Sequence, residues 1–402
     1  MRRAAFLAAL ALAWPVVPAH PASARSPYQI AGTCGGLPRI QVTTAHGFCL
    51  ALVADGLRFP RGVLSLGPDR FLVADMGGGD RDIGRIWQFD RAGKGFTGTV
   101  LVRKLDRPHG IELGPDGKVY VGIVGGVKRF DPADPAATLE DVIGGGSEIA
   151  GPPGDGLHPL ASLLFTSRRT LLINGGSFTN NCEGPNGELP PQGVACPETR
   201  GPNAHGVVRE YSFDWNTGKA TGVAILAEGL RNSLGFLETK NGTLLQVENS
   251  RDSIDDLMPN LAGDEDLPPD EINILEPGAH YGWPYCYGAN IASPDYPGFD
   301  CGAMTKPLIE LPAHAAPLSM AWFDGGLIVA YHGYRAHGHR IVRFALGADG
   351  LPEGESEDLV SGWDGGGTGP QGAPVDLEPT PDANLLISED RNGTILLLTR
   401  IE

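Results

Sequence analysis

The sequence predicts an all-β fold, a six-bladed β-propeller in which a strand near the N-terminus closes the last blade. The first observation behind this prediction is an internal repeat. Six segments each combine a small-residue start, an apolar strand, a polar turn and a second apolar strand. Repeats of this size, built from a few strands each, are typical of propeller blades. They span residues 60–74, 108–121, 159–173, 233–247, 317–329 and 374–387.

The second observation is a composition rich in turn-forming residues. The chain of 402 residues contains 58 glycines and 34 prolines, and no low-complexity block accounts for them. Turns such as Gly-Pro-Asp-Gly and Lys-Asn-Gly inside the repeats favour tight connections between antiparallel strands. No long segment shows the 3.6-residue apolar period of a helix. A two-domain sandwich is the other all-β solution, but it does not explain six similar units.

The two ends of the chain predict how the ring closes. The sixth repeat lacks an outer strand, because the chain stops at Glu402 soon after its third strand. An unassigned apolar strand at residues 50–54 precedes the first repeat, and we expect it to complete the sixth blade. Closure protects strand edges that an open array would expose. The expected divisions are a signal peptide at 1–24, an extension with a disulfide at 25–49, and the propeller at 50–402.

The first two dozen residues have the layout of a secretory signal peptide. Arg2 and Arg3 are followed by an apolar run at residues 4–17, and an Ala-Ser-Ala sequence at 22–24 suits signal peptidase. The run is too short to span a membrane, and an uncut N-terminal anchor is the alternative. We therefore expect an exported protein, periplasmic or secreted, with no membrane span.

The cysteines and the net charge describe the environment in which the protein works. Six cysteines form three local groups, as expected for disulfides in an exported protein. The sequence alone does not establish the connectivity, but loop closure favours neighbours. The favoured pairs are Cys34 with Cys49, Cys182 with Cys196, and Cys286 with Cys301. A formal charge of −17 makes nucleic acids and anionic membranes poor partners.

The repeat register selects candidate site residues, because the innermost strands of a propeller all start at one face of the ring. The residues beside these starts are Phe59, Arg107, His158, Arg231 with Asn232, Ala316 and Ala373. Three consecutive repeats place polar or charged groups at this axial mouth, and the other three place apolar ones. A one-sided polar cluster of this kind suits a ligand site.

Each polar candidate has a functional and a structural interpretation. His158 could act as a general base near neutral pH, or it could cap a strand or bond a loop carbonyl. Arg231 could bind an anion or stabilise an oxyanion, or it could pair with an acid such as Glu228. Arg107 has the same two interpretations.

Two further patterns are less specific. His332, His337 and His339 could bind a metal, or they could be solvated loop histidines. The acidic stretch at residues 252–271 lacks the ligand order of an EF-hand. It could be a solvated loop or could hold one calcium ion.

Four ordered motifs carry a family resemblance. They are Gly-Leu-Arg-Asn at 229–232, Val-Glu-Asn at 247–249, Asp-Glu-Ile-Asn at 270–273 and Tyr-Gly-Trp-Pro at 281–284. This set resembles the soluble quinoprotein sugar dehydrogenases, the glucose/sorbosone dehydrogenase family, over most of the chain after about residue 50. The resemblance implies a six-bladed propeller that uses pyrroloquinoline quinone (PQQ) and calcium.

The resemblance also implies roles for individual residues. It assigns the catalytic base to His158 and contacts with the quinone oxygens to Arg231 and Asn232, with Arg231 stabilising the negative charge that develops on reduction. Calcium would be held by the backbone carbonyls of Ser250 and Arg251. A further cofactor contact, a basic residue that pairs with a cofactor carboxylate, falls near Arg335.

Two positions depart from the family pattern. The family usually presents an arginine to the cofactor just before the Pro-Val of the sixth unit, where this chain has Ala373, with Gln371 nearby. Arg107 could compensate from another blade. Ala161 stands where sorbosone-type members commonly have an arginine.

The leading hypothesis is therefore a PQQ- and calcium-dependent dehydrogenase. Its substrate would be a small sugar or a related alcohol or aldehyde, and its electrons would pass to an external acceptor. One alternative is a calcium-dependent lactonase, a function that also occurs on six-bladed propellers. The other is a non-catalytic binding propeller that has lost the cofactor, which Ala373 favours.

Overall fold

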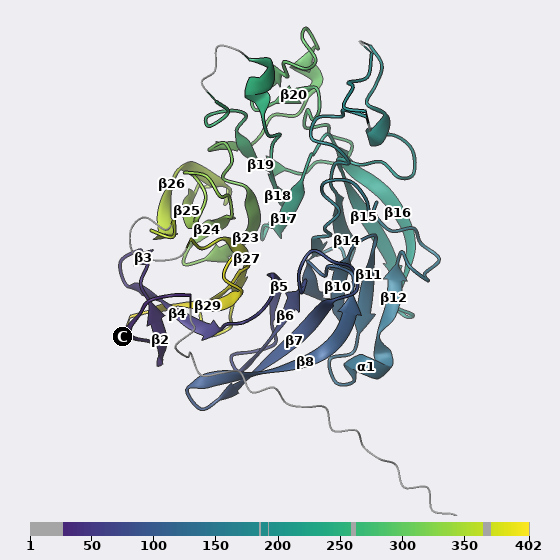
Figure 1. The fold of residues 1–402 in the computed structure, drawn as a ribbon. Helices are drawn as coiled ribbons and strands as arrows, with labels where there is room; N and C mark the ends of the chain where they lie inside the picture. Colours follow the sequence, from purple (N-terminus) through teal and green to yellow (C-terminus); the bar gives the residue numbers. More distant parts are fainter. Residues whose placement is uncertain (1–26, 185, 192, 259–262, 365–370, 402) are drawn as a thin grey trace, which may run out of the picture.

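The computed structural model describes residues 27–184, 186–191, 193–258, 263–364 and 371–401, and places six β-sheets around a ring (Figure 1). The signal peptide expected at 1–24 lies outside the described residues. The predicted six-bladed all-β propeller is confirmed. None of the helices in the described ranges is long and apolar enough to cross a membrane.

The first three blades are four-stranded antiparallel sheets, in which the chain runs from the innermost strand outward. Blade one contains β5 (Pro60–Ser65), β6 (Arg70–Asp75), β7 (Gly84–Ala92) and β8 (Gly95–Leu105). Blade two contains β9 (Ile111–Leu113), β10 (Val119–Ile123), β11 (Gly126–Phe130) and β12 (Glu140–Ile143), with the short helix α1 (Pro135–Thr138) before β12. Blade three contains β13 (Leu163–Phe165), β14 (Leu171–Gly175), β15 (Val207–Asp214) and β16 (Lys219–Glu228).

Each of the last three blades includes at least one strand that does not directly follow the others in the chain. Blade four contains β17 (Ser233–Glu238), β18 (Leu244–Glu248), β19 (Asp270–Ile274) and β22 (Ile309–Leu311). Blade five contains β23 (Pro317–Phe323), β24 (Gly326–Tyr331), β25 (Arg340–Leu346), β26 (Pro352–Ser361) and β3 (Thr43–Thr44). Blade six contains β27 (Pro374–Pro379), β28 (Leu385–Glu389), β29 (Thr394–Arg400), β4 (Phe48–Ala54), β2 (Leu37–Ile40) and β1 (Ile30–Cys34).

The ring closes through the pairing of β4 with β29. The two strands are antiparallel, with Leu50 opposite Leu398 and Ala54 opposite Ile395. Leu50, Leu398 and Leu52 are buried in one apolar cluster between blades five and six. Burial of each leucine contributes about 1.5–3 kcal/mol. The predicted closure by an N-terminal strand is confirmed, and the strand begins two residues earlier than expected, at Phe48.

Two long loops rise from blades three and four and form the upper part of the molecule in Figure 1. Residues 176–206 lead from β14 to β15, and residues 275–308 lead from β19 to β22 through the small hairpin of β20 (Cys286–Tyr287) and β21 (Ile291–Ala292). Each loop contains one disulfide, and the backbone N–H of Cys196 donates to the Tyr285 hydroxyl at 2.6 Å across them. The bonds Cys34–Cys49, Cys182–Cys196 and Cys286–Cys301 confirm the three expected pairs.

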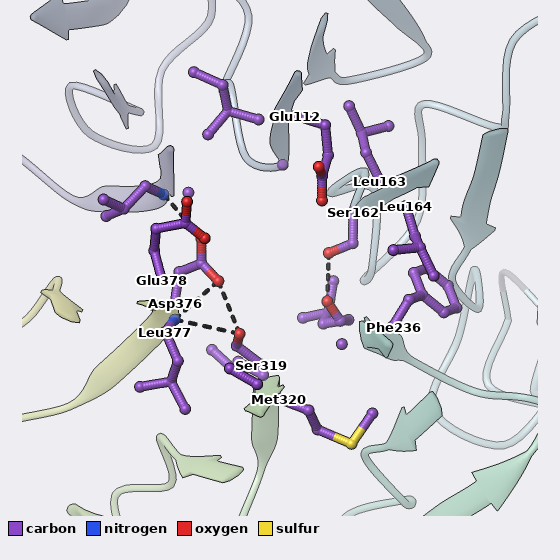
Figure 2. Close-up of a pocket in the computed structure, with 18 of the residues that line it drawn as sticks. Glu112, Ser162, Leu163, Leu164, Phe236, Ser319, Met320, Asp376, Leu377 and Glu378 are labelled. Atoms are coloured by element: carbon purple, nitrogen blue, oxygen red, sulfur yellow. Dashed lines mark hydrogen bonds between the residues drawn. The ribbon is translucent and has the colours of Figure 1, made fainter. Parts of the chain in front are cut away.

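A cavity of about 330 Å³ runs along the ring axis, and residues of all six innermost strands line it. Figure 2 shows the carboxylates of Glu112, Asp376 and Glu378 facing this cavity. Asp376 accepts hydrogen bonds from the Val63 backbone N–H and the Ser319 hydroxyl, both at 2.8 Å. These bonds connect β27 with β5 and β23, so the carboxylate holds three neighbouring blades together at the axis.

Burial in the cavity raises the pKa of all three carboxyls. Burial and the charges of Glu378 and Asp376 raise the pKa of Glu112 well above its usual value. Burial, then the charge of Asp376, raises the pKa of Glu378 to about 8. Burial also raises the pKa of Asp376, against the hydrogen bonds that it accepts. Because these acids hold protons more tightly in the folded chain than in the unfolded chain, ionising them destabilises the fold.

The Glu112→Gln variant should therefore stabilise the protein in a pH-dependent way. Near pH 4 the Glu112 carboxyl is largely protonated in both states, and the variant should unfold at about the wild-type temperature. The penalty of ionisation grows as the pH rises from about 4 to 8, so at pH 8 we expect a gain of about 1 kcal/mol in unfolding free energy. Thermal melts at both pH values measure this difference. The exposed Glu355→Gln change is the control, and equal stability of Glu112→Gln and wild type at pH 8 would contradict the prediction.

Candidate active site

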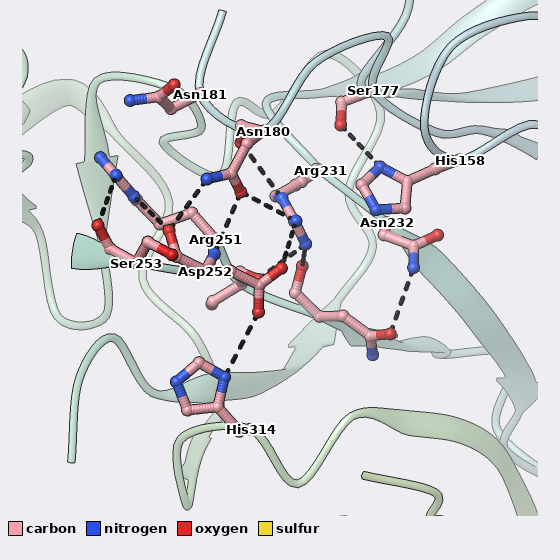
Figure 3. Close-up of polar contacts among 12 residues, drawn as sticks. His158, Ser177, Asn180, Asn181, Arg231, Asn232, Arg251, Asp252, Ser253 and His314 are labelled. Atoms are coloured by element: carbon pink, nitrogen blue, oxygen red, sulfur yellow. Dashed lines mark hydrogen bonds and ion pairs between the residues drawn. The ribbon is translucent and has the colours of Figure 1, made fainter. Parts of the chain in front are cut away.

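The polar half of the axial mouth is formed by blades three and four and the loops above them (Figure 3). His158 precedes β13, and Arg231 with Asn232 precedes β17. Residues 249–253 follow β18, and Ser177 and Asn180 begin the loop after β14. The structure thus brings most of the sequence-predicted residues together at one side of the ring.

His158 is half-buried and is held from one side by Ser177. Its Nδ1 lies 2.8 Å from the Ser177 hydroxyl oxygen. Burial, and then the positive charge of Arg231, lower the pKa of the imidazole to about 3. His158 is therefore neutral at physiological pH and has a free lone pair on one ring nitrogen.

Arg231 is 4% exposed, and its guanidinium lies in a cage of oxygen atoms. It donates to both oxygens of Asn180, through Nε to the backbone oxygen at 3.1 Å and through Nη2 to Oδ1 at 2.9 Å. Nη1 donates to the Ser250 carbonyl at 2.7 Å, and Nη2 pairs with the Asp252 carboxylate at 2.9 Å. The acidic partner of Arg231 is thus Asp252, whereas the sequence suggested Glu228.

The Glu248 carboxylate fixes the backbone beneath the site. It accepts the backbone N–H of Arg231, the backbone N–H of Asn232 at 3.2 Å and the Ser233 hydroxyl at 3.1 Å. Burial raises the pKa of Glu248 to about 7, although these bonds oppose the shift. Asn232 also donates to the Asn249 side chain at 3.2 Å. The two candidate residues therefore share one buried anchor.

Arg335 joins the site through a chain of charged groups. Its guanidinium pairs with Asp264, and His314 lies between Asp264 and Asp252. The hydrogen bond from His314 is the main cause that lowers the pKa of Asp252 to about 2, and the same contact raises the pKa of His314. Asp252 in turn holds Arg231. The Asp252 side chain is 57% exposed, so water would solvate this carboxylate if another anion took its place on Arg231.

The loop of Ser250 and Arg251, the predicted metal ligands, is held from both sides. The Ser250 backbone N–H donates to Asp270 at 2.8 Å, and the Arg251 side chain is buried in an ion pair with Asp295. The Ser250 carbonyl points toward Arg231. Carbonyl oxygens are ligands that calcium accepts. Within the described ranges, no group of three or more His, Cys, Asp or Glu side chains is arranged to hold a metal ion.

A second polar cluster lies at the mouth and was not expected from the sequence. Arg61, 6% exposed, pairs with Asp390, and its Nη2 lies 3.1 Å from Nε2 of His109. His332 bonds the same carboxylate at 3.1 Å. The Asp390 backbone N–H donates to the Ala373 carbonyl at 3.4 Å, so Asp390 connects Arg61 with the position where the resemblance implies an arginine.

The expectation of solvated histidines at the mouth needs revision, whereas that of a compensating Arg107 stays a prediction. Arg107, suggested as the compensating arginine, bonds the neighbouring carboxylate of Asp106 at 2.9 Å. His332 and His339 are packed residues rather than solvated ones, because His332 bonds Asp390 and buried His339 bonds the Gly372 carbonyl at 2.7 Å. The repeat register pointed to the residue before each strand, whereas Arg61 is the second residue of β5.

Comparison with known proteins identifies the family. The family model described as TrAA12-like matches residues 42–401. The chain belongs to the TrAA12-like family. The resemblance to quinoprotein sugar dehydrogenases carried by the sequence motifs is thereby confirmed.

The TrAA12-like chain has relatives in fungi. A pyrroloquinoline quinone-dependent pyranose dehydrogenase of Coprinopsis cinerea is 25% identical over 434 residues, which cover 92% of this chain and 56% of that relative. The chain thus spans about half the length of this curated relative.

Solved structures share the fold. The calcium structure of the Trichoderma reesei Carbohydrate-Active Enzymes Family AA12 protein has a TM-score of 0.69 at 20% identity, and the match covers 95% of this chain and 99% of the other. The holo form of the pyranose dehydrogenase PQQ domain from Coprinopsis cinerea has a TM-score of 0.68 at 22% identity, with 91% and 99% coverage.

The anchor beneath the site of this TrAA12-like chain can be tested through stability. Glu248→Ala removes the acceptor for four buried donors, the three above and the Gln246 side chain, so we expect a loss of about 2–4 kcal/mol in unfolding free energy. Chemical denaturation measures the change. The exposed Glu276→Ala substitution on the following loop should change stability by less than about 0.5 kcal/mol. A similar small effect at Glu248 would show that its carboxylate does not anchor Arg231 and Asn232.

Proposed function

We propose that this chain is a PQQ- and calcium-dependent dehydrogenase that oxidises a sugar or related alcohol or aldehyde and passes the electrons to an external acceptor. The observation that carries the proposal is the placement of a neutral, half-buried His158 at the same mouth as Arg231 and Asn232. Family membership supports the same conclusion, and a periplasmic or secreted location agrees with the expected signal peptide.

The residues at the mouth suit an anionic quinone. Arg231 and Asn232 would contact its oxygens, Arg335 would face a carboxylate, and Arg61 would supply the guanidinium missing at Ala373. One buried atom of Arg61, its Nε, has no hydrogen-bond partner among the described residues, so the bonds of this guanidinium are not all satisfied by the chain itself. A desolvated arginine–carboxylate contact is strong enough to matter for affinity. Arg107 is a lesser candidate, because its Nε is already bonded to Asp106.

The loop after β18 suits calcium only in part. Ser250 and Arg251 would offer two backbone oxygens, whereas calcium takes six to eight oxygen ligands. The cofactor and water would have to provide the others. When bound, the quinone would accept a hydride from the substrate carbon, and calcium would polarise the reactive carbonyl as a Lewis acid.

His158 would take the proton of the substrate hydroxyl while the carbon that carries it loses the hydride. A base whose pKa is about 3 is weak for this task near neutral pH. Part of that depression comes from the positive charge of Arg231. The charge of Asp252, which pairs with Arg231, already opposes this depression. An anionic ligand would raise the pKa of His158 further only where it brings more negative charge to Arg231 than Asp252 does.

The non-catalytic alternative also has an observation in its favour. Arg231, Arg335 and Arg61 each pair with a carboxylate of the chain itself, which competes with an anionic ligand. The lactonase alternative needs carboxylate or amide ligands at the mouth, and Asn232 already bonds Asn249 there. Measurements of quinone binding and of lactone hydrolysis distinguish both alternatives from the dehydrogenase.

Incubation with PQQ and calcium should give a protein that reduces an artificial electron acceptor when a sugar is added. Calorimetry should show quinone binding that depends on calcium. His158→Asn should lose at least about a hundredfold in turnover but bind the quinone with wild-type affinity, because it removes only the base. The exposed His46→Asn change is the matched control. Absence of quinone binding would overturn the proposal, and lactone hydrolysis without quinone would favour the lactonase.

The role of Arg61 can be tested separately by affinity. The double change Arg61→Gln with Asp390→Asn removes the guanidinium without leaving an unpaired buried carboxylate. We expect quinone affinity to fall at least about tenfold, which corresponds to about 1.4 kcal/mol. Arg107→Gln should have a smaller effect. If the two variants bind alike, Arg61 does not replace the missing arginine.

A further inference from the structure

Ser177 connects the two loops that carry the candidate base and the candidate arginine. It is fully buried, at 0% exposure. Its backbone N–H donates to the Arg231 carbonyl at 2.7 Å, and its carbonyl accepts the His158 backbone N–H at 3.3 Å. Its hydroxyl oxygen lies 2.8 Å from His158 Nδ1 and 2.6 Å from the Thr179 carbonyl oxygen. One side chain therefore bridges the imidazole and its own loop.

The two contacts of this hydroxyl determine where the protons lie. A serine hydroxyl has one proton to donate, and a carbonyl oxygen has none. Two oxygens 2.6 Å apart repel each other unless a proton lies between them, so the hydroxyl proton must point toward Thr179. The hydrogen bond between Ser177 and His158 then requires a proton from the imidazole. Nδ1 is the protonated nitrogen, and Nε2 keeps the lone pair.

We propose that Ser177 is a positioning residue that holds His158 as the Nδ1–H tautomer and directs Nε2 toward the mouth. Figure 3 shows the second ring nitrogen turned away from Ser177, on the side of Asn232. No described residue bonds this nitrogen, so it is available to a ligand. The base role of Nε2 rests on the proposed function, whereas the tautomer rests on the Ser177 contacts alone.

The neutral hydroxyl also has a chemical consequence. A carboxylate at this position would hold the same tautomer and would also stabilise the imidazolium. A hydroxyl fixes the orientation without a negative charge. Ser177 would therefore orient the His158 ring without adding a charge to it. The pKa of His158 would then depend on the charged groups around Arg231.

The test is NMR of the cofactor-free protein labelled with ¹⁵N-histidine, because the two tautomers give distinct long-range ¹H–¹⁵N patterns. The His158 signal is assigned by its loss in His158→Asn. Wild type at neutral pH should show the Nδ1–H form. Ser177→Ala should release the ring into a mixture that contains the Nε2–H form, and Ser177→Thr, which keeps a hydroxyl, should restore the wild-type pattern.

A matched control is Ser162→Ala, which removes another buried serine that contacts a histidine and a carbonyl, in this case His109 and Leu234. It should leave the His158 signal unchanged. In the reconstituted enzyme, Ser177→Ala should lower kcat about 10- to 100-fold while KM and quinone affinity change little. An Nε2–H form in wild type, or an unchanged tautomer in Ser177→Ala, would overturn the proposal. The Nδ1–H form in a protein that binds no quinone would keep the positioning role and remove the proposed function.

Discussion

Closure of the ring by β4 on β29 is the constraint on which the site depends. Each innermost strand contacts the next, and β27 contacts β5, so no blade can move along the axis without displacing its neighbours. The bonds of Asp376 to β5 and β23 show the same coupling at the axis. Residues far apart in the sequence, such as Arg61 and Asp390, can form a buried ion pair because the closed ring places blade one beside blade six.

Charge at the mouth is balanced before any ligand arrives. The buried guanidiniums of Arg61 and Arg231 each have a carboxylate partner, as expected where an unpaired buried charge would be costly. The partners differ in burial: Asp390 is fixed by His332 as well, whereas Asp252 is largely exposed. An anionic ligand would therefore displace Asp252 more easily than Asp390. Arg231 can therefore exchange its carboxylate partner more readily than Arg61 can.

The fold was largely predictable because it repeats. Six copies of the same strand–turn–strand pattern defined the blade register, and the register alone selected His158 and Arg231. The residues that hold them were not predictable in this way. These residues are Ser177, Asp252 and Glu248, which make contacts between loops or lie at a strand end. Such contacts leave no periodic pattern in the sequence. Arg61 was missed because its importance depends on a neighbour more than 300 residues away, Asp390.

His158 has a low pKa, and its hydrogen-bond partner Ser177 is uncharged. Burial and the charge of Arg231 disfavour the imidazolium, and the serine hydroxyl gives it no compensating charge. A permanently activated base would need a carboxylate in place of Ser177. The negative charge nearest to this pair is that of Asp252, which binds Arg231 and raises the pKa of His158 against the effect of the guanidinium. The pKa of His158 therefore depends on the anion that pairs with Arg231, and in the ligand-free chain that anion is the Asp252 carboxylate.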